Sequence, residues 1–183
     1  MIAYLVLLLA IVSRILPLQT HYWNFTAVGG SLLFFGARRP RWQTAIAVLA
    51  LAITDFCLTH FAYNYPFRVR GYLITWAWYA GVCLLGHGLL SRKASFLRVG
   101  AAVFTSATSF FLISNFVVWM GMTAPGLYPH TFAGLVDCYT TALPFYGNDL
   151  VSTALVAGAL FGLPVLAHKI AGAMNHGNDS AAA

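Results

Sequence analysis

The sequence predicts an all-α integral membrane protein with six transmembrane helices and both termini in the cytoplasm. Of its 183 residues, 60% are hydrophobic and 8% are charged, and the mean hydropathy is +0.77. Soluble domains carry roughly 25% charged residues. Within lipid, helices satisfy their own backbone polar groups. We expect one transmembrane domain over residues 1–174 and a disordered cytoplasmic tail over 175–183.

Six apolar runs account for the expected crossings. A hydrocarbon layer of about 30 Å requires about 20 helical residues. The first run has no basic leader and contains Arg14, so we expect a retained helix and not a signal peptide. The expected spans are 1–18, 25–37, 42–61, 71–90, 96–121 and 149–171.

The basic residues give the direction of these crossings. Seven of the ten lie in three short places, each at an alternate gap between the runs. Short loops rich in Lys and Arg stay in the cytoplasm, which puts these gaps on the cytoplasmic side of the membrane. Arg68 and Arg70 are exceptions, because they fall in an expected outer loop. The seven residues are Arg38, Arg39, Arg41, Arg92, Lys93, Arg98 and Lys169.

The second span, 25–37, is short. At 1.5 Å per residue it covers about 20 Å, which is less than the hydrocarbon thickness. Trp23 and Trp42 could hold it in a locally thin bilayer, or it could be a partly broken helix buried among the others. Gly29 and Gly30 favour the second arrangement, because paired glycines permit a kink or close backbone approach. Broken backbone at this depth usually lines a cavity, so the span hints at function.

The segment 122–148 between the fifth and sixth spans is too long for a structureless loop in a compact protein. Its apolar residues recur at helical spacing over 132–143, and Pro144 would end such a helix. We expect a short amphipathic helix at the outer interface. It could cover helix ends, or it could act as a lid over a binding site.

Arg14 and Asp55 are expected to face one another inside the membrane. Each lies about 13 residues from the cytoplasmic end of its span, or about 20 Å deep. A lone charge at that depth costs several kcal/mol, which favours pairing. The pair could serve helix packing alone, or it could form the floor of an outward-facing site. The other residues expected to line or cover that site are Asn24, Asn115, Trp119, Tyr128, Asp137, Tyr139 and Asp149.

Small residues in the sixth span offer a surface for helix contact. Ala154, Gly158 and Gly162 recur every four residues, a pattern that lets helix backbones touch. They could pack on a small, hydroxylated stripe within 101–109 of the fifth span. They could instead join the chain to an energising module or to a second copy.

Other classes of function find no support in the sequence. The chain has four acidic residues, all aspartate, and its six histidines are scattered. It contains no nucleophile, phosphate-loop or metal motif, and its three cysteines have no paired spacing. The net charge of +6 marks the cytoplasmic flanks and forms no continuous patch for nucleic acid. We therefore expect no enzymatic activity, cofactor, metal or nucleic-acid partner.

Short motifs through most of the chain carry a resemblance to a known family. They occupy 14–17, 24–26, 55, 115–116 with 119, 128–129, 134–135, 138–139, 144–145 and 148–149. As a set they resemble the DUF6580-type family of bacterial six-helix transport proteins. That family is similar in size and helix count to the S components of energy-coupling-factor vitamin transporters, particularly cobalamin-type ones. The resemblance implies uptake of a small polar or vitamin-like solute, and a non-transporting scaffold or assembly subunit is the alternative.

Overall fold

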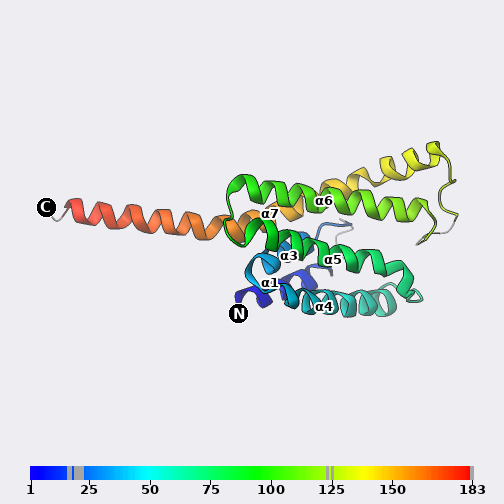
Figure 1. Ribbon diagram of the computed structural model, residues 1–183, viewed down its shortest axis with the longest axis horizontal. Helices are drawn as coiled ribbons and strands as arrows, with labels where there is room; N and C mark the ends of the chain where they lie inside the picture. The colour runs from blue at the N-terminus through cyan, green and yellow to red at the C-terminus, as the bar shows by residue number, and fades with distance from the viewer. Residues whose placement is uncertain (16–17, 19–22, 123, 125, 182–183) are drawn as a thin grey trace.

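The computed structural model describes residues 1–15, 18, 23–122, 124 and 126–181, with side chains as far as Ala167. Within this part of the chain all regular structure is helical, and six α-helices form an elongated bundle from which the last helix projects (Figure 1). Among the described residues, four helices are long and apolar enough to cross a membrane, and one shorter helix is also apolar. The chain is therefore a multi-pass helical membrane protein whose apolar surfaces contact lipid.

The helices follow the order of the predicted spans. The third, fourth and fifth predicted spans agree with the structure to within a few residues. In the third, the Arg41–Gln43 turn and the π-helical turn Leu58–Ala62 extend the central helix at both ends, which gives one continuous span, Arg41–Ala62. The helices are α1 (Ile2–Ser13), α3 (Val28–Arg38), α4 (Thr44–Cys57), α5 (Val69–Leu90), α6 (Phe96–Trp119) and α7 (Phe132–Ala181).

The short helix α3 is the centre of the bundle. Ten of its eleven residues are buried, and it packs against α1, α5 and α7. A helix that is apolar all round belongs in an interior. At about 16 Å it cannot cross the hydrocarbon layer alone. The predicted shortness of this helix is confirmed. Of the two arrangements that the sequence allowed, the helix adopts burial among the other helices. The helix Val28–Arg38 is unbroken, however, so the structure shows burial without the break that this alternative allowed.

Glycines allow the neighbours of α3 to approach its backbone. A Cβ atom built on Gly30 would lie 2.7 Å from Cβ of Val156 and 2.9 Å from the backbone nitrogen of Ala157, both on α7. Gly36 lies in the same way against the backbone of Cys83 on α5. The close approach predicted for Gly29 and Gly30 is therefore confirmed, Gly36 adds a further one, and all occur within a regular helix.

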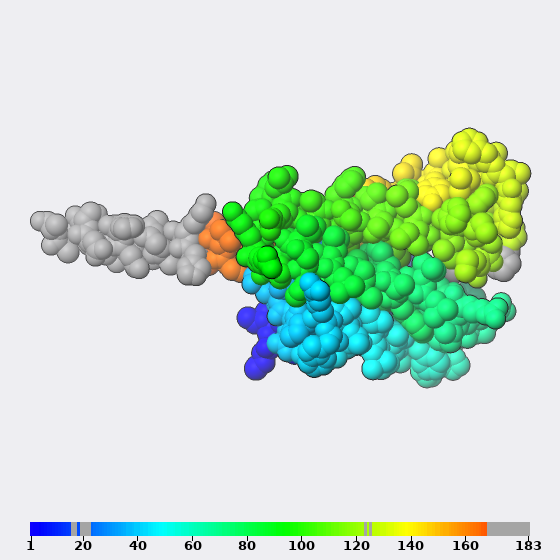
Figure 2. Space-filling view, in the orientation of Figure 1, coloured from blue at the N-terminus to red at the C-terminus, as the bar shows by residue number. Residues whose placement is uncertain are grey.

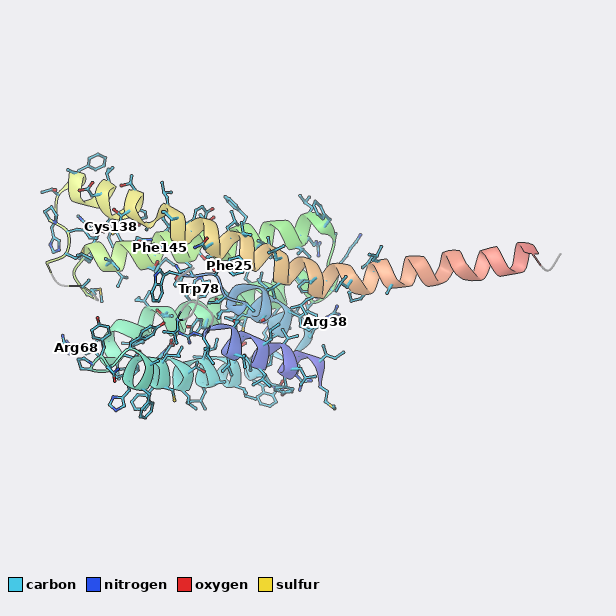
Figure 3. All side chains as sticks on the ribbon, turned by 180° about the vertical axis from the view of Figure 1, so that it is seen from behind. Phe25, Arg38, Arg68, Trp78, Cys138 and Phe145 are labelled. Atoms are coloured by element: carbon cyan, nitrogen blue, oxygen red, sulfur yellow. The ribbon has the colours of Figure 1, made fainter. Side chains whose placement is uncertain are left out.

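The basic clusters gather at one end of the bundle. The α3–α4 and α5–α6 connections lie at the end where the chain begins and from which α7 projects (Figure 1). Arg38 stands at this end and Arg68 at the opposite one (Figure 3). Arg39 donates through Nε to Oε1 of Gln43 at 2.5 Å and through Nη2 to the Tyr4 hydroxyl at 3.0 Å. These bonds join α1 to the start of α4 beside the basic loops.

The expected outer amphipathic helix and the sixth span form one continuous helix, α7, with Pro144 and Pro164 inside it. The prediction that Pro144 ends a separate helix is therefore wrong. Proline removes one backbone hydrogen bond, but packing on neighbouring helices sustains proline-containing membrane helices. Here α6 packs along α7, where Cys138 and Ala142 are buried. The two helices lie along one flank of the molecule and α4 along the other (Figure 2).

The backbone of α7 is helical as far as Ala181. This range includes positions 175–181, for which the sequence predicted disorder. An existing helix propagates more readily than a new one nucleates, so the transmembrane part of α7 can extend into a polar segment.

The small-residue face of α7 is exposed in the described part of the chain. Ala154, Gly158 and Gly162 are exposed, and a Cβ atom on either glycine would meet nothing within 4 Å. The expected packing of this face on the fifth span is therefore wrong. The helix instead turns the adjacent face inward, where Thr153 and Ala157 are buried.

Candidate functional site

A cavity of about 150 Å³ lies at the N-terminal end of α3. Phe25 and Trp78 mark this level, midway along the bundle between Arg38 and Arg68 (Figure 3). Because α3 is short, the longer helices around it continue past its first residue, and the cavity occupies the space that they leave. The lining residues are Arg14, Trp23, Asn24, Thr26, Val28, Leu58, Tyr63, Trp78, Tyr79, Phe110 and Asp149.

The predicted pairing of Arg14 with Asp55 is confirmed. Nη2 of Arg14 donates to Oδ1 of Asp55 at 2.5 Å, and Nε1 of Trp76 donates to Oδ2 at 2.9 Å. Asp55 is only 2% exposed, and both of its oxygens accept a hydrogen bond. The ion pair therefore neutralises the arginine, whose guanidinium still borders the cavity.

Asp149 of α7 is the other charged residue in the cavity wall. Its Oδ1 accepts a hydrogen bond from Thr153 Oγ1 at 3.4 Å, whereas its Oδ2 has no partner in the described part of the chain. The residue is only 7% exposed. A buried acceptor without a donor is unfavourable, so this oxygen is suited to a hydrogen-bond donor from a bound solute.

Hydrogen bonds hold the turn over residues 23–27, which leads into α3 and forms one side of the cavity. Ser13 Oγ accepts from the backbone N–H of Ala27 at 2.8 Å, which ties the end of α1 to the start of α3. Asn148 Nδ2 donates to the carbonyl of Trp23 at 3.0 Å, which ties the same turn to α7. Asn24 adopts a φ of 63°, a left-handed conformation that Asn tolerates better than most residues. The wall is therefore held from two sides.

A smaller cavity of about 70 Å³ adjoins the first one and shares Asn24, Phe110 and Asp149 with it. It adds Asn115, whose Nδ2 donates to the carbonyl of Phe111 at 2.8 Å on the same helix. The structure thus brings together Asn24, Asn115 and Asp149 from the predicted set, with Arg14 and its partner Asp55 beside them.

The other four predicted site residues line neither cavity. Trp119 Nε1 donates to the carbonyl of Pro129 at 3.1 Å, and the Tyr139 hydroxyl donates to the carbonyl of Leu112 at 2.6 Å. These bonds fasten α7 and the loop before it to α6. Tyr128 lies in that loop and Asp137 is exposed on the first turns of α7. The described part of segment 122–148 nevertheless lines the smaller cavity through Ala142, Phe145 and Tyr146, and its action as a lid stays a prediction.

Five aromatic side chains line the main cavity, and none of them belongs to the predicted site. Aromatic residues on α5 recur at steps of four and three, which places Tyr72, Trp76 and Tyr79 on one face of that helix. This spacing is the signal that could have identified Trp76 as a hydrogen-bond donor to Asp55. Burial raises the pKa of the Tyr63 phenol, although the nearby Arg14 acts against this rise, so its hydroxyl is neutral. The aromatic lining residues are Trp23, Tyr63, Trp78, Tyr79 and Phe110.

The described residues contain no candidate metal site, because no three His, Cys, Asp or Glu side chains lie close enough together to hold an ion. Cys83 and Cys138 are buried apart from the main cavity, and Cys57 is exposed. The absence of a metal, a cofactor and enzymatic activity remains a prediction.

Comparison with known proteins supports the resemblance of the motifs at the level of the family. Neither a search of curated proteins nor a search of solved structures finds a match. A family model described as a family of unknown function, DUF6580, matches residues 1–174. The match includes every residue of both cavities. This chain therefore belongs to the DUF6580 family, a family of unknown function.

Proposed function

We propose that the protein binds a small polar solute in the main cavity and carries it inward across a bacterial inner membrane. The observation that supports this proposal is the buried and unpaired Oδ2 of Asp149, a residue that lines the same cavity as Arg14. The carboxylate accepts a donor group of the solute, and the remaining N–H groups of the arginine donate to an acceptor group. The ion pair with Asp55 holds the arginine in place.

The size of the cavity limits the solute. Pockets for drug-sized ligands measure about 300–1,000 Å³, and this one measures about 150 Å³. The described state accommodates a solute of a few heavy atoms, and a vitamin-sized solute requires a more open state. Transport then follows from different affinities for the solute in outward-facing and inward-facing states.

The orientation of the protein follows from its charges. The basic end is cytoplasmic under the positive-inside rule, with the first helix starting there and α7 projecting from it. Tyr63 lines the cavity and also a surface groove of about 790 Å³ at the opposite end. The solute therefore enters past Tyr63 from outside. Action as an S component with an energising module is the most specific form of this proposal.

Native mass spectrometry of the purified full-length protein tests solute binding. We expect a co-isolated small molecule on the parent protein. Asp149→Asn should lower its retention about tenfold and Asn24→Gly about fivefold, which corresponds to the loss of one charged and one neutral hydrogen bond. Glycine is chosen at position 24 because it keeps the left-handed backbone.

Asn64→Gly is the matched control for Asn24→Gly. Asn64 also has a positive φ, of 56°, but lines neither cavity. It should retain the solute as the parent does. Solute binding is ruled out if the parent carries only lipid and detergent, and the assigned cavity is wrong if all three variants retain the molecule equally.

A second candidate function, a membrane scaffold or assembly subunit, is favoured by one observation. The face of α7 formed by Ala154, Gly158 and Gly162 is exposed and has open space beside it. Such faces allow close helix contact in membranes. A second copy of the chain, or a partner helix, fits there.

Gly158→Leu tests this scaffold function. Because no atom lies near the site, folding stability should change by less than about 0.5 kcal/mol. Self-association in detergent, measured by light scattering after size exclusion, should be lost. Gly100→Leu on α6, which also has nothing within 4 Å, is the control. An unchanged oligomeric state in both variants would exclude this face as a self-association surface.

A further inference from the structure

A surface groove at the end opposite the basic loops has features of a binding site in its own right. It measures about 790 Å³ and lies between the turns that follow α4 and the first turn of α5. Arg68 marks its position in Figure 3. The residues that line it are Thr59, Tyr63, Tyr65, Pro66, Arg68, Val69, Arg70, Gly71, Tyr72 and Met122.

The two arginines in this groove have no acidic partner. Among the described residues the one ion pair is that of Arg14 with Asp55. Asp149 is buried in the central cavity and Asp137 is exposed on α7, and neither lines the groove. The two guanidinium groups are exposed and uncompensated, at the end where the positive-inside rule disfavours basic residues.

The wall behind the arginines is held in one conformation. Phe67 stacks on Tyr72 with ring centroids 4.9 Å apart and an interplanar angle of 15°. The Tyr72 hydroxyl is hydrogen-bonded to Thr59 Oγ1 at 2.5 Å, and the N–H of Tyr65 donates to the carbonyl of Thr59 at 3.0 Å. The backbone leading into Arg68 is therefore ordered before any ligand arrives, which lowers the entropic cost of binding.

We propose that this groove binds an anionic phosphate or carboxylate group through Arg68 and Arg70. Guanidinium groups form paired hydrogen bonds to such anions, and the hydroxyl-bearing wall supplies further donors. The anion belongs either to a soluble molecule or to the headgroup of a lipid in the same leaflet. The site rests on its own geometry and does not depend on solute binding in the central cavity.

Charge-removing variants of the purified full-length protein test the proposal. The double variant Arg68→Gln/Arg70→Gln removes both groove charges. Arg92→Gln/Lys93→Gln removes the same charge from exposed residues at the other end of the bundle and is the control. The soluble probe is inorganic phosphate against chloride at matched ionic strength, with the unfolding midpoint as readout. The lipid probe is phosphatidylglycerol against phosphatidylcholine, with adducts counted by native mass spectrometry.

We expect at least one anionic probe to bind the parent and the control, and to bind the groove variant at least tenfold more weakly. If the groove variant loses only phosphate binding, the natural ligand of the groove is a soluble anion. If it loses only phosphatidylglycerol binding, the natural ligand is a lipid headgroup. Equal binding of both probes to the groove variant and the control overturns the proposal. Retention of the cavity solute by the groove variant is a separate measurement, so either proposal can fail alone.

Discussion

Replacing Gly36 with alanine is expected to prevent stable packing of α3 against α5. A Cβ atom at this position would lie 2.6 Å from the carbonyl carbon of Cys83 and 2.8 Å from its Cα. These are backbone atoms of a helix, which cannot rotate away as a side chain can. Overpacking costs typically 1–3 kcal/mol where side chains can shift, so we expect about 3 kcal/mol or more here. The unfolding midpoint in detergent measures the effect.

Gly81→Ala on α5 is the matched control for Gly36→Ala. A Cβ atom at Gly81 meets nothing within 4 Å, and alanine favours a helix over glycine by about 1 kcal/mol. Its midpoint should stay the same or rise. Gly86→Ala should resemble Gly36→Ala, because its Cβ would lie 2.9 Å from backbone atoms of Leu33 across the same contact. Equal midpoints for Gly36→Ala and Gly81→Ala would show that the two helices do not touch there.

Removing either partner of the Arg14–Asp55 pair is expected to cost about 3–5 kcal/mol of folding stability, because the other partner remains as an uncompensated buried charge. Arg14→Gln and Asp55→Asn are the variants of choice. The amide oxygen of asparagine still accepts the hydrogen bond that Trp76 donates to this position. Thermal and denaturant unfolding of each variant give the loss.

The double variant Arg14→Gln/Asp55→Asn separates the charge effect from other losses. Since it buries no lone charge, it should be more stable than either single variant, with a coupling free energy of more than about 1 kcal/mol. Strict additivity of the two single losses would contradict the ion pair. If the double variant folds and retains the solute like the parent, the pair serves packing alone.

Local patterns in the sequence were sufficient for most of the helices. Hydropathy and length identified the three middle spans, and the depth of Arg14 and Asp55 was enough to pair them. The pairing could be predicted because an unpaired charge is so costly in hydrocarbon that few alternatives remain. The shortness of the second span was also evident, together with the glycines that let it pack closely.

The composition of the site was less predictable. Polarity predicts Asn24, Asn115 and Asp149, but equally polar or aromatic residues such as Trp119 and Tyr139 fasten α7 and the loop before it to α6. The two groups share residue types and differ only in which neighbours surround them. The unpaired state of one Asp149 oxygen is likewise a property of packing, because it depends on donors from other helices.

The sequence by itself determined the membrane class, the three middle helical spans and the gathering of basic residues in alternate loops, because each depends on the local preference of residues for lipid or water. The tertiary structure decided three further features. It continued α7 through Pro144, it left the face of Gly158 and Gly162 uncovered, and it opened a cavity beyond the first residue of α3. All three depend on contacts between segments distant in the chain, which the periodicity of a single helix does not contain.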